Sequence, residues 1–516
     1  MSAENELPAS WATARLDEVC TINGRGFTPF VSGDDQPVAF VPMAAVVEEF
    51  GGIDVSARRP LGEVTKGYTA FVEGDVLFAK ITPCMENGKV AVVPPLSTHI
   101  GFGSTEFHVL RSAGAVEPKW VGYHLSQLQF RRAARQDMTG SAGQLRVQSS
   151  WLAGACIPVA PIAEQRRAIQ RIDELLSDLD AGVLELVTAK RKLSQYRQSL
   201  LKAAVEGALT AEWRERNPPQ ETGAELLARI LRERRARWEL RQLEKFAAQG
   251  KAPPKDWQRK FATPRAVDVS DSAGMRDGWT WASIDELADL GTGVTPLRSN
   301  RQFFDGGDIP WVTSGALNAE RVTEPTEYVT QHAVRQCRLE VYPAGALLVA
   351  MYGEGKTRGK CAELAIDAAI NQAIAALVFG GASLGCRDYV KVVLWSSYEL
   401  MRQQASGGVQ PNLNLQIIKG LAVPLPPLTE QIAIIETLST QLEGLQSQEH
   451  AITHGLRLAA AQRQNILRAA FAGQLVPQDP ADEPASALLA RIRAERAQRP
   501  AAAKRMRRSS PQPATP

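Results

Sequence analysis

Two long stretches of the chain place an apolar residue at every seventh position, and most of the positions between are polar. A seven-residue apolar repeat that continues over several turns indicates an α-helix paired with another helix along a coiled-coil seam. The predicted seam residues are Ile172, Leu179, Leu186, Leu193, Leu200, Leu438, Leu445, Ile452 and Ile466.

Each of these helices is predicted to begin just after a proline, Pro161 in the first and Pro427 in the second. A helix of about 45 residues is roughly 65 Å long, which is more than the width of a globular domain. The length of the seam favours pairing of the two helices with each other. The alternative is that each helix packs on its own globular domain.

The regions outside the long helices show a different pattern. Short Val, Ile and Leu runs such as DVLFAKI (75–81) and ALLVAMY (346–352) lie between Gly- and Pro-rich turns, which is typical of strands. Amphipathic stretches such as KWVGYHLSQLQFRRAARQ (119–136) are typical of helices. The fold class is therefore predicted to be mixed α+β, with two globular α/β domains.

The whole arrangement occurs twice. IPVAPIAEQ (157–165) resembles VPLPPLTEQ (423–431), and LLARILRER (226–234) resembles LLARIRAER (488–496). A period of this length excludes a solenoid. We predict two copies of one unit, in which a globular domain precedes a long helix and a charged segment. The predicted boundaries are 1–160, 161–211, 212–273, 274–425, 426–475 and 476–516, and the basic end of the last segment is predicted to be disordered.

Composition narrows the class of protein. The 516 residues carry a formal net charge of only +3, so overall charge does not by itself indicate nucleic acid. Six Cys occur without zinc spacing, which suits a reduced chain without a structural metal. The start of the chain is polar and acidic, so no secretion signal is predicted. No apolar run is long enough to predict a membrane span. These features predict a cytoplasmic protein.

One stretch resembles a nucleotide-binding motif. AMYGEGKT (350–357) fits a loose phosphate-binding loop, in which Lys and Thr should open a helix. Here a strand-like run follows Gly359, and the first copy lacks the motif. A turn that presents cations to DNA is therefore favoured over an ATP site. Elsewhere we find no nucleophile–base pair and no complete set of metal ligands, so no catalytic or metal-binding residue is predicted.

Polar and basic side chains gather instead in loops of both globular domains. Arg and Lys commonly contact phosphate or guanine, and Asn and Gln contact adenine. Each residue alone could be a solvated turn, but together they indicate a DNA-binding surface. The candidates are Arg25, Lys80, Lys89, Gln144, Arg146, Arg298, Arg301, Thr313, Ser314, Lys356, Arg358, Lys360, Gln410 and Asn412.

Several segments together resemble the specificity subunits of Type I restriction–modification enzymes. They are TGVTPLRSNRQFFDGGDIPWV (292–312), NQAIAAL (371–377), VPLPPLTEQIAII (423–435), SLLKAAVEGALTAEWRE (199–215) and ILRAAFAGQL (466–475). The resemblance implies that 1–160 and 274–425 are target-recognition domains, each reading one half of a split site in double-stranded DNA. It also implies that the two long helices pair antiparallel and separate these domains.

The same resemblance implies partners and cofactors. The helices would dock two modification (methyltransferase) subunits, which carry S-adenosylmethionine, and through them restriction subunits, which carry ATP and Mg²⁺. The chain itself would bind no cofactor and would not be catalytic. Two other hypotheses remain at this point. One is a coiled-coil scaffold whose duplicated domains bind protein, and the other is a stand-alone nuclease or ATPase.

Overall fold

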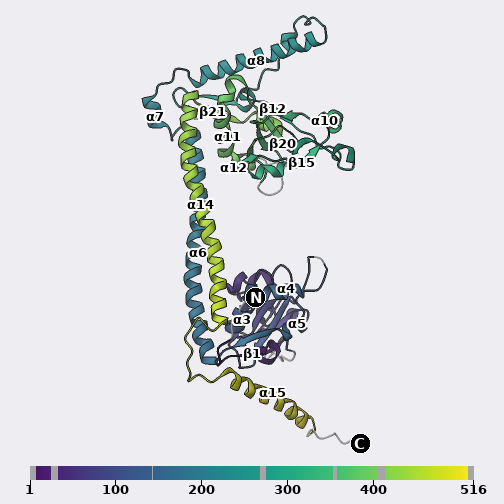
Figure 1. Cartoon of the computed structure of the whole chain (residues 1–516), viewed down its shortest axis with the longest axis vertical. Coiled ribbons are helices and arrows are strands. Elements are labelled where there is room, and N and C mark those ends of the chain that lie inside the picture. The colour runs from purple at the N-terminus through teal and green to yellow at the C-terminus, as the bar shows by residue number, and fades with distance from the viewer. Residues whose placement is uncertain are drawn as a thin grey trace. The chain divides into compact units, whose positions relative to one another are not determined.

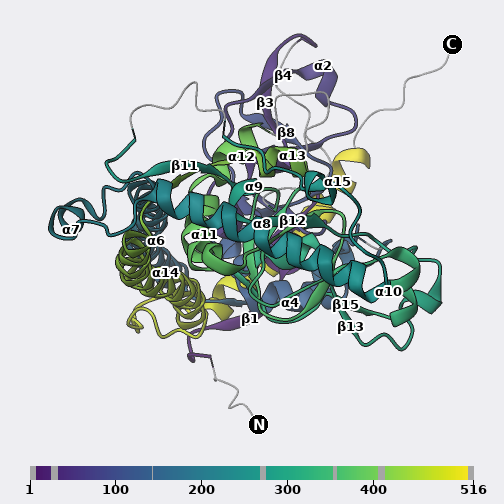
Figure 2. The ribbon, with the colours of Figure 1, turned by 90° about the horizontal axis from the view of Figure 1, so that it is seen from above.

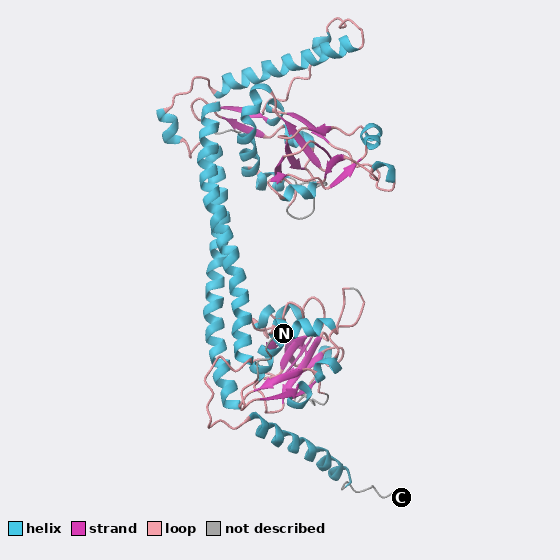
Figure 3. Cartoon of the chain, viewed as in Figure 1, coloured by secondary structure: helices cyan, strands magenta, loops and turns pink. Residues whose placement is uncertain are grey.

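A computed structural model describes residues 7–24, 33–141, 143–267, 275–352, 357–404 and 413–508 (Figures 1 and 3). The chain forms two compact units, of which unit 1 comprises residues 1–188 and 452–516, and unit 2 comprises residues 189–451. Each unit therefore takes residues from both halves of the sequence.

Domain 1, in unit 1, is built on three small sheets. Their strand orders are β1-β10, β2-β9-β6-β7 and β4-β3-β8-β5, and β3 and β8 are parallel. The strands are β1 (Ala12–Arg15), β2 (Cys20–Ile22), β3 (Pro37–Val41), β4 (Arg58–Pro60), β5 (Thr69–Val72), β6 (Val76–Ala79), β7 (Val90–Val92), β8 (Ile100–Gly103), β9 (Phe107–Ser112) and β10 (Cys156–Val159).

Domain 2, in unit 2, repeats this plan. Its sheets are β11-β21, β12-β20-β17-β18-β14 and β15-β13-β19-β16, in which β13 and β19 are parallel, as are β14 and β18. The strands are β11 (Thr280–Ser283), β12 (Asp289–Thr292), β13 (Ile309–Val312), β14 (Arg321–Val322), β15 (Glu327–Val329), β16 (Val341–Tyr342), β17 (Leu347–Ala350), β18 (Cys361–Leu364), β19 (Ala368–Ile370), β20 (Ile374–Val378) and β21 (Ala422–Leu425).

Short helices cover these sheets. Those of domain 1 are α1 (Leu16–Val19), α2 (Leu61–Val64), α3 (Pro118–Ser126), α4 (Leu128–Gln136) and α5 (Ser149–Gly154), with 3-10 turns η1 (Met43–Ala45) and η2 (Glu48–Phe50). Those of domain 2 are α9 (Ile284–Leu287), α10 (Gln331–Cys337), α11 (Arg387–Ser396), α12 (Tyr398–Gln404) and α13 (Leu415–Lys419), with η4 (Arg301–Phe303), η5 (Ser314–Asn318) and η6 (Gly381–Cys386). The predicted mixed helix-and-sheet class is confirmed.

Two helices of 44 residues each, α6 (Ile162–Val205) and α14 (Leu428–Phe471), carry the seven-residue repeats. They lie side by side in Figures 1 and 2. In unit 1, the start of α6 packs against the end of α14, because Ile172 and Leu176 share a core with Ile466 and Leu467. The predicted antiparallel pairing is therefore confirmed.

In unit 2, the end of α6 packs against the start of α14, since Leu200 and Leu201 share a core with Ile434 and Leu438. Every predicted seam residue is buried or half-buried, whereas most residues between them are exposed. Near the middle, the unit 1 part of the pair brings Leu186 against Gly455, where an added Cβ would lie 3.2 Å from the Leu186 Cδ1 atom. We call the two helices together the stalk.

Each unit is closed by a helix that follows the stalk helix of the other copy. The helix α8 (Gly223–Ala248) comes after α6 and a short helix α7 (Ala211–Arg216), and it buries Leu226 and Ile230 in the core of unit 2. The helix α15 (Ala485–Arg508) comes after α14, and it buries Leu488, Leu489 and Ile492 in the core of unit 1.

The repeated LLAR sequences make matching contacts in the two units. Arg234 of α8 donates to the backbone carbonyl of Asp285, and Arg496 of α15 donates to that of Asp17. Internal duplication is therefore present in individual hydrogen bonds as well as in strand order.

The repeated Glu-Gln pair in the first turn of each stalk helix joins three elements. Glu430 is 1% exposed, and its carboxylate accepts hydrogen bonds from Thr210 Oγ1, Arg214 Nε and Trp279 Nε1, each at 2.8 Å. Thr210 and Arg214 follow the end of α6, and Trp279 precedes β11. We call this arrangement the Glu430 latch. It ties the end of one stalk helix to the start of the other and to domain 2.

The matching residue in unit 1 is Glu164, which is also 1% exposed and accepts a hydrogen bond from Gln478 Nε2 at 3.0 Å. Burial raises the pKa of Glu164. Its neighbour Gln165 donates to the carbonyls of Ala115 and Ala160 and accepts from the Glu117 amide, which fixes the start of α6 on domain 1.

The stability of unit 1 is predicted to fall in mild acid because of His124. This side chain packs against Phe130 and Phe471, and its Nε2 lies 3.0 Å from the Cys156 carbonyl oxygen. Burial lowers its pKa to about 4. Between that value and the unfolded value of about 6.5, the unfolded chain binds more protons, so stability falls as the pH falls through this window.

The expected loss is on the order of 2 kcal/mol at about pH 5, compared with neutral pH. Urea unfolding at the two pH values measures it, and His124→Gln should remove most of the difference. A wild-type difference that His124→Gln leaves unchanged would assign the acid sensitivity to other groups, of which His108, whose pKa is also lowered by burial, is the first to test.

Among the described residues, the structure has no helix with both the length and the apolar character needed to cross a membrane.

Candidate nucleic-acid interface

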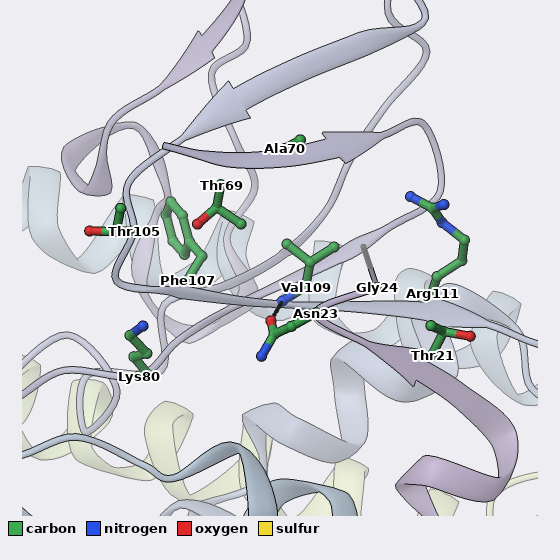
Figure 4. A pocket seen from close by; sticks show the side chains of 10 residues that line it. All are labelled: Thr21, Asn23, Gly24, Thr69, Ala70, Lys80, Thr105, Phe107, Val109 and Arg111. Carbon is green, nitrogen blue, oxygen red and sulfur yellow. Dashed lines mark hydrogen bonds between the residues drawn. The ribbon is translucent and has the colours of Figure 1, made fainter. Parts of the chain in front are cut away.

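In domain 1, three of the candidate residues, Lys80, Gln144 and Arg146, lie close to the end of β6. Lys80 follows β6 directly, and its backbone bonds to Glu106 on one side and to Val147 on the other. With Asn23, Thr69 and Phe107 it lines a pocket of about 220 Å³ (Figure 4). Asn23 is held in this wall because its side-chain oxygen accepts from the Val109 amide at 3.0 Å.

Two arginines near this pocket differ from Lys80 in their surroundings. Arg111, on the opposite side of the pocket in Figure 4, pairs with the buried Asp75 at 2.5 Å. Arg146 makes a forked pair with Glu106, with Nε–Oε2 and Nη2–Oε1 distances of 3.0 and 2.9 Å. The Arg146 guanidinium lowers the pKa of Glu106, so this carboxylate stays charged and holds the arginine in place.

A hairpin carries Gln144 and Arg146. Thr139 and Arg146 exchange two backbone hydrogen bonds of 3.1 and 2.9 Å, and Gly140 and Gly143 between them have positive φ angles that favour glycine. Gln144 is exposed in this turn. A fixed guanidinium next to an exposed amide is a combination that can contact base edges in a DNA groove.

Lys89 has a different environment from the other candidates of domain 1. Its ammonium donates to the Met43 carbonyl oxygen at 3.1 Å and thus pins the η1 turn. Arg25 lies outside the described residues.

In domain 2, Arg298 is the most constrained candidate. Its Nη1 lies 2.7 and 2.5 Å from the two carboxylate oxygens of Glu327, and its guanidinium lies 5.1 Å from the Phe304 ring and 5.3 Å from the Trp311 ring. Such a guanidinium is oriented in advance and still has donors available. Arg301, at the start of η4, is exposed and forms no ion pair with any described residue.

The remaining described candidates of domain 2 are joined through η5. Thr313 precedes this turn, and its amide donates to Thr326 Oγ1 at 3.0 Å, while Ser314 is its first residue. At its end, Asn318 accepts from Lys360 Nζ at 2.9 Å. Arg298 is linked to this turn along the chain, because it lies against Trp311 of β13, the strand that leads into Thr313.

The segment around Arg358 tests the phosphate-loop hypothesis. After Thr357 the chain turns at Gly359, which has a φ of +81°, and enters β18. A phosphate-binding loop needs a helix at this point, so that backbone amides and the helix dipole meet the phosphates. The Nε of Arg358 is buried without a hydrogen-bond acceptor among the described residues. Lys356, Gln410 and Asn412 lie outside the described residues.

The two domains thus present polar and basic groups after equivalent strands, since Lys80 follows β6 and Lys360 lies in the connection after β17. Sequence reasoning did not single out Asn318, Glu106 or Glu327, which hold Lys360, Arg146 and Arg298. Their distance along the chain from these cations left no local signal.

Among the described residues, no group of three or more His, Cys, Asp or Glu side chains is placed to hold a metal ion. The candidate loops of both domains carry basic and amide side chains, which are residue types that contact DNA phosphates and bases.

Comparison with known proteins supports this interpretation. Residues 276–453 match the family described as "Type I restriction modification DNA specificity domain". The chain is 30% identical over 338 residues to the Type I restriction enzyme EcoEI specificity subunit of Escherichia coli. This alignment covers 57% of the chain and 53% of that protein. It is also 30% identical over 325 residues to the Type I restriction enzyme EcoAI specificity subunit of Escherichia coli, in an alignment that covers 55% of this chain and 51% of that protein.

The matched stretch therefore spans about half the length of these two relatives. The fold of the chain is similar to that of a chain in a solved structure. That structure is described as concerning "complex assembly and conformational transition of the type I R-M system". The TM-score is 0.64 at 19% identity, and the alignment covers 91% of this chain and 99% of the other.

Proposed function

We propose that the chain is a specificity subunit of a Type I restriction–modification complex and that it reads DNA for that complex. Each globular domain reads one half of a bipartite site in double-stranded DNA. The stalk sets the spacing of the two halves. The chain itself is not catalytic.

One observation carries this proposal. Two domains whose strand orders match, apart from the additional strand β14 in domain 2, present loop-borne cations and amides after equivalent strands, and both are anchored on one antiparallel helix pair. A reader of split sites needs two similar surfaces with different side chains. The scaffold hypothesis accounts for the duplication, but it does not account for arginines oriented by carboxylates at the domain surfaces.

The stalk also supports the proposed docking of two modification subunits and, through them, restriction subunits. Large apolar side chains are exposed on it, although a helix pair needs them only at its seam. In the part belonging to unit 1, Leu184, Val187 and Leu458 are 67%, 50% and 56% exposed. In unit 2, Ile432 is 48% exposed. Exposed apolar side chains on a helix suit the apolar face of a partner helix.

The chemistry is proposed to reside on those partners. S-adenosylmethionine would be bound by the modification subunits, and ATP with Mg²⁺ by the restriction subunits. We propose a cytoplasmic complex, in agreement with the composition of the chain.

The test is methylation of a random-sequence DNA library by the complete complex. Arg298→Ala is expected to relax one base position in one half of the site, at about 1–3 kcal/mol for a lost base contact. Arg301→Ala is expected instead to weaken binding to all sequences alike. The slope of log affinity against log salt should fall by the amount that corresponds to about one phosphate contact.

The half of the site read by domain 1 should be unchanged in both variants, which provides the internal control. The proposal is wrong if the wild-type complex methylates without sequence preference. It is also wrong if the Arg298→Ala variant loses preference in both halves equally.

A further inference from the structure

The charged insert after α7 is a folded projection of unit 2. The helix α8 runs along domain 2 and makes contacts with α9, β11 and η6 (Figure 1). Beyond its last turn the chain returns through the 3-10 turn η3 (Trp257–Lys260). We call residues 223–265 the wing.

An aromatic cluster holds the returning segment on the helix. Trp238 stacks on Trp257 at a ring distance of 5.7 Å, and Phe246 and Phe261 meet these rings edge to face at 6.0 and 5.4 Å. All four side chains are half-buried. Since such a cluster fixes the backbone on both sides of the turn, the charges of this segment have defined positions.

The wing concentrates positive charge. It contains twelve Lys and Arg against five Asp and Glu, a net charge of +7, whereas the whole chain carries only +3. The rest of the chain therefore has a net charge of −4. The field of the wing is strongly positive even though the protein as a whole is close to neutral.

Several of these cations have roles within the fold. Arg229 pairs with Glu221 at 2.7 Å, Arg234 with Asp289 at 2.8 Å and Arg235 with Glu239 at 3.1 Å. Four lysines have no such role. Among the described residues, Lys245, Lys251, Lys255 and Lys260 are exposed and form no ion pair or side-chain hydrogen bond.

A favourable interaction with the helix dipole accounts for the position of only one of the four lysines. Lys245 lies in the last turn of α8, where the helix dipole favours a cation. Lys251, Lys255 and Lys260 follow the helix, on the segment that the aromatic cluster fastens. Compact ammonium groups on flexible stems suit phosphate as point charges and do not discriminate between bases.

We propose that the wing is a second, sequence-independent DNA contact, in which these four lysines neutralise backbone phosphates of duplex outside the bases read by domain 2. This inference rests on the proposed function, because it presumes that the chain binds DNA. It predicts that part of the affinity is independent of the target sequence and is lost with rising salt.

The experiment compares the complete complex with a variant carrying K245Q, K251Q, K255Q and K260Q. Affinity for long duplexes is measured over a range of salt concentrations, with and without the target site. Each phosphate contact contributes about 0.9 to the slope of log affinity against log salt, so the slope should fall by about three to four. The base preference in the methylation library should not change.

Two matched variants on the same helix serve as controls. Glu244 is exposed and forms no ion pair with any residue that the structure describes, so Glu244→Gln raises the wing charge and should strengthen binding to all duplexes. Leu240 and Leu243 are 58% and 42% exposed and would serve a protein partner better than DNA. L240S with L243S should leave the salt slope unchanged.

An unchanged slope in the four-lysine variant would overturn the inference. So would a loss of partner subunits from that variant without a change in slope, which would make the wing a protein interface. A change in base preference would show that the wing belongs to the recognition surface. None of these results affects the proposed function, which is tested separately by the base preference of the wild-type complex and of the Arg298→Ala variant.

Discussion

Replacing Leu186 by Asp is expected to abolish sequence-specific modification while both globular domains remain folded. Leu186 is a half-buried seam residue of α6 that lies against Gly455 of α14. A carboxylate there loses the apolar contact and places an unpaired charge at the seam, at about 2 kcal/mol or more. The domains have separate cores, so the loss falls on the stalk.

The measurement is methylation of a library of split sites, together with near-ultraviolet circular dichroism as a check on domain packing. Glu185→Gln, at the exposed neighbouring position, should behave as wild type. Full activity of the Leu186→Asp variant at an unchanged gap would contradict the role of the stalk in spacing.

A gentler change tests the same role. Insertion of seven residues into both stalk helices keeps the seam in register and lengthens each helix by about 10 Å. The preferred gap should then grow by about three base pairs at 3.4 Å each. Maximal activity should also fall, because about three base pairs turn the second half-site by roughly 100° around the duplex.

Loss of the Glu430 latch is expected to cause the largest loss of stability from a single side chain. Glu430→Ala removes one buried carboxylate and leaves Arg214, Thr210 and Trp279 without their acceptor. Removal of one partner from a buried, hydrogen-bonded pair costs about 3–5 kcal/mol. The side chain of Arg214 is 19% exposed, so it has limited access to water as a replacement partner.

Chemical denaturation of unit 2 measures this effect, with Glu436→Ala as the control at an exposed position of the same helix. The control should change stability by no more than about 0.5 kcal/mol. Glu430→Gln, which keeps an acceptor, should lie between the two. A loss below about 1 kcal/mol in Glu430→Ala would show that the latch is not a stabilising contact.

The parts of this fold that were predicted from the sequence are those with a periodic or repeated signal. The seam from Ile172 to Leu200 follows from its seven-residue spacing, and the two-unit plan follows from the paired segments. Both signals can be recognised without knowledge of the fold. The seam needs only the spacing of residues along one helix, and the repeat needs only the comparison of two segments.

The missed features depend on contacts that are distant in sequence. Arg146 was assigned to DNA by its type and its turn, but its pairing with Glu106 requires the fold. The start of the second stalk helix was predicted from Pro427, and the role of Glu430 as a latch was missed. A usable signal was present, because two adjacent polar residues recur after proline in both copies, where solvent-exposed positions would be free to differ.

The exchange of closing helices between the two copies has a consequence for the origin of the chain. A protein made of one copy alone would have a domain, one stalk helix and one closing helix, but no second stalk helix to complete the seam and no second domain to receive the closing helix. Two such half-chains could complete each other as a homodimer, each lending its closing helix to the other. Their two identical surfaces would read a palindrome. Gene duplication and fusion would then let each surface change independently, so that the recognised site could become asymmetric.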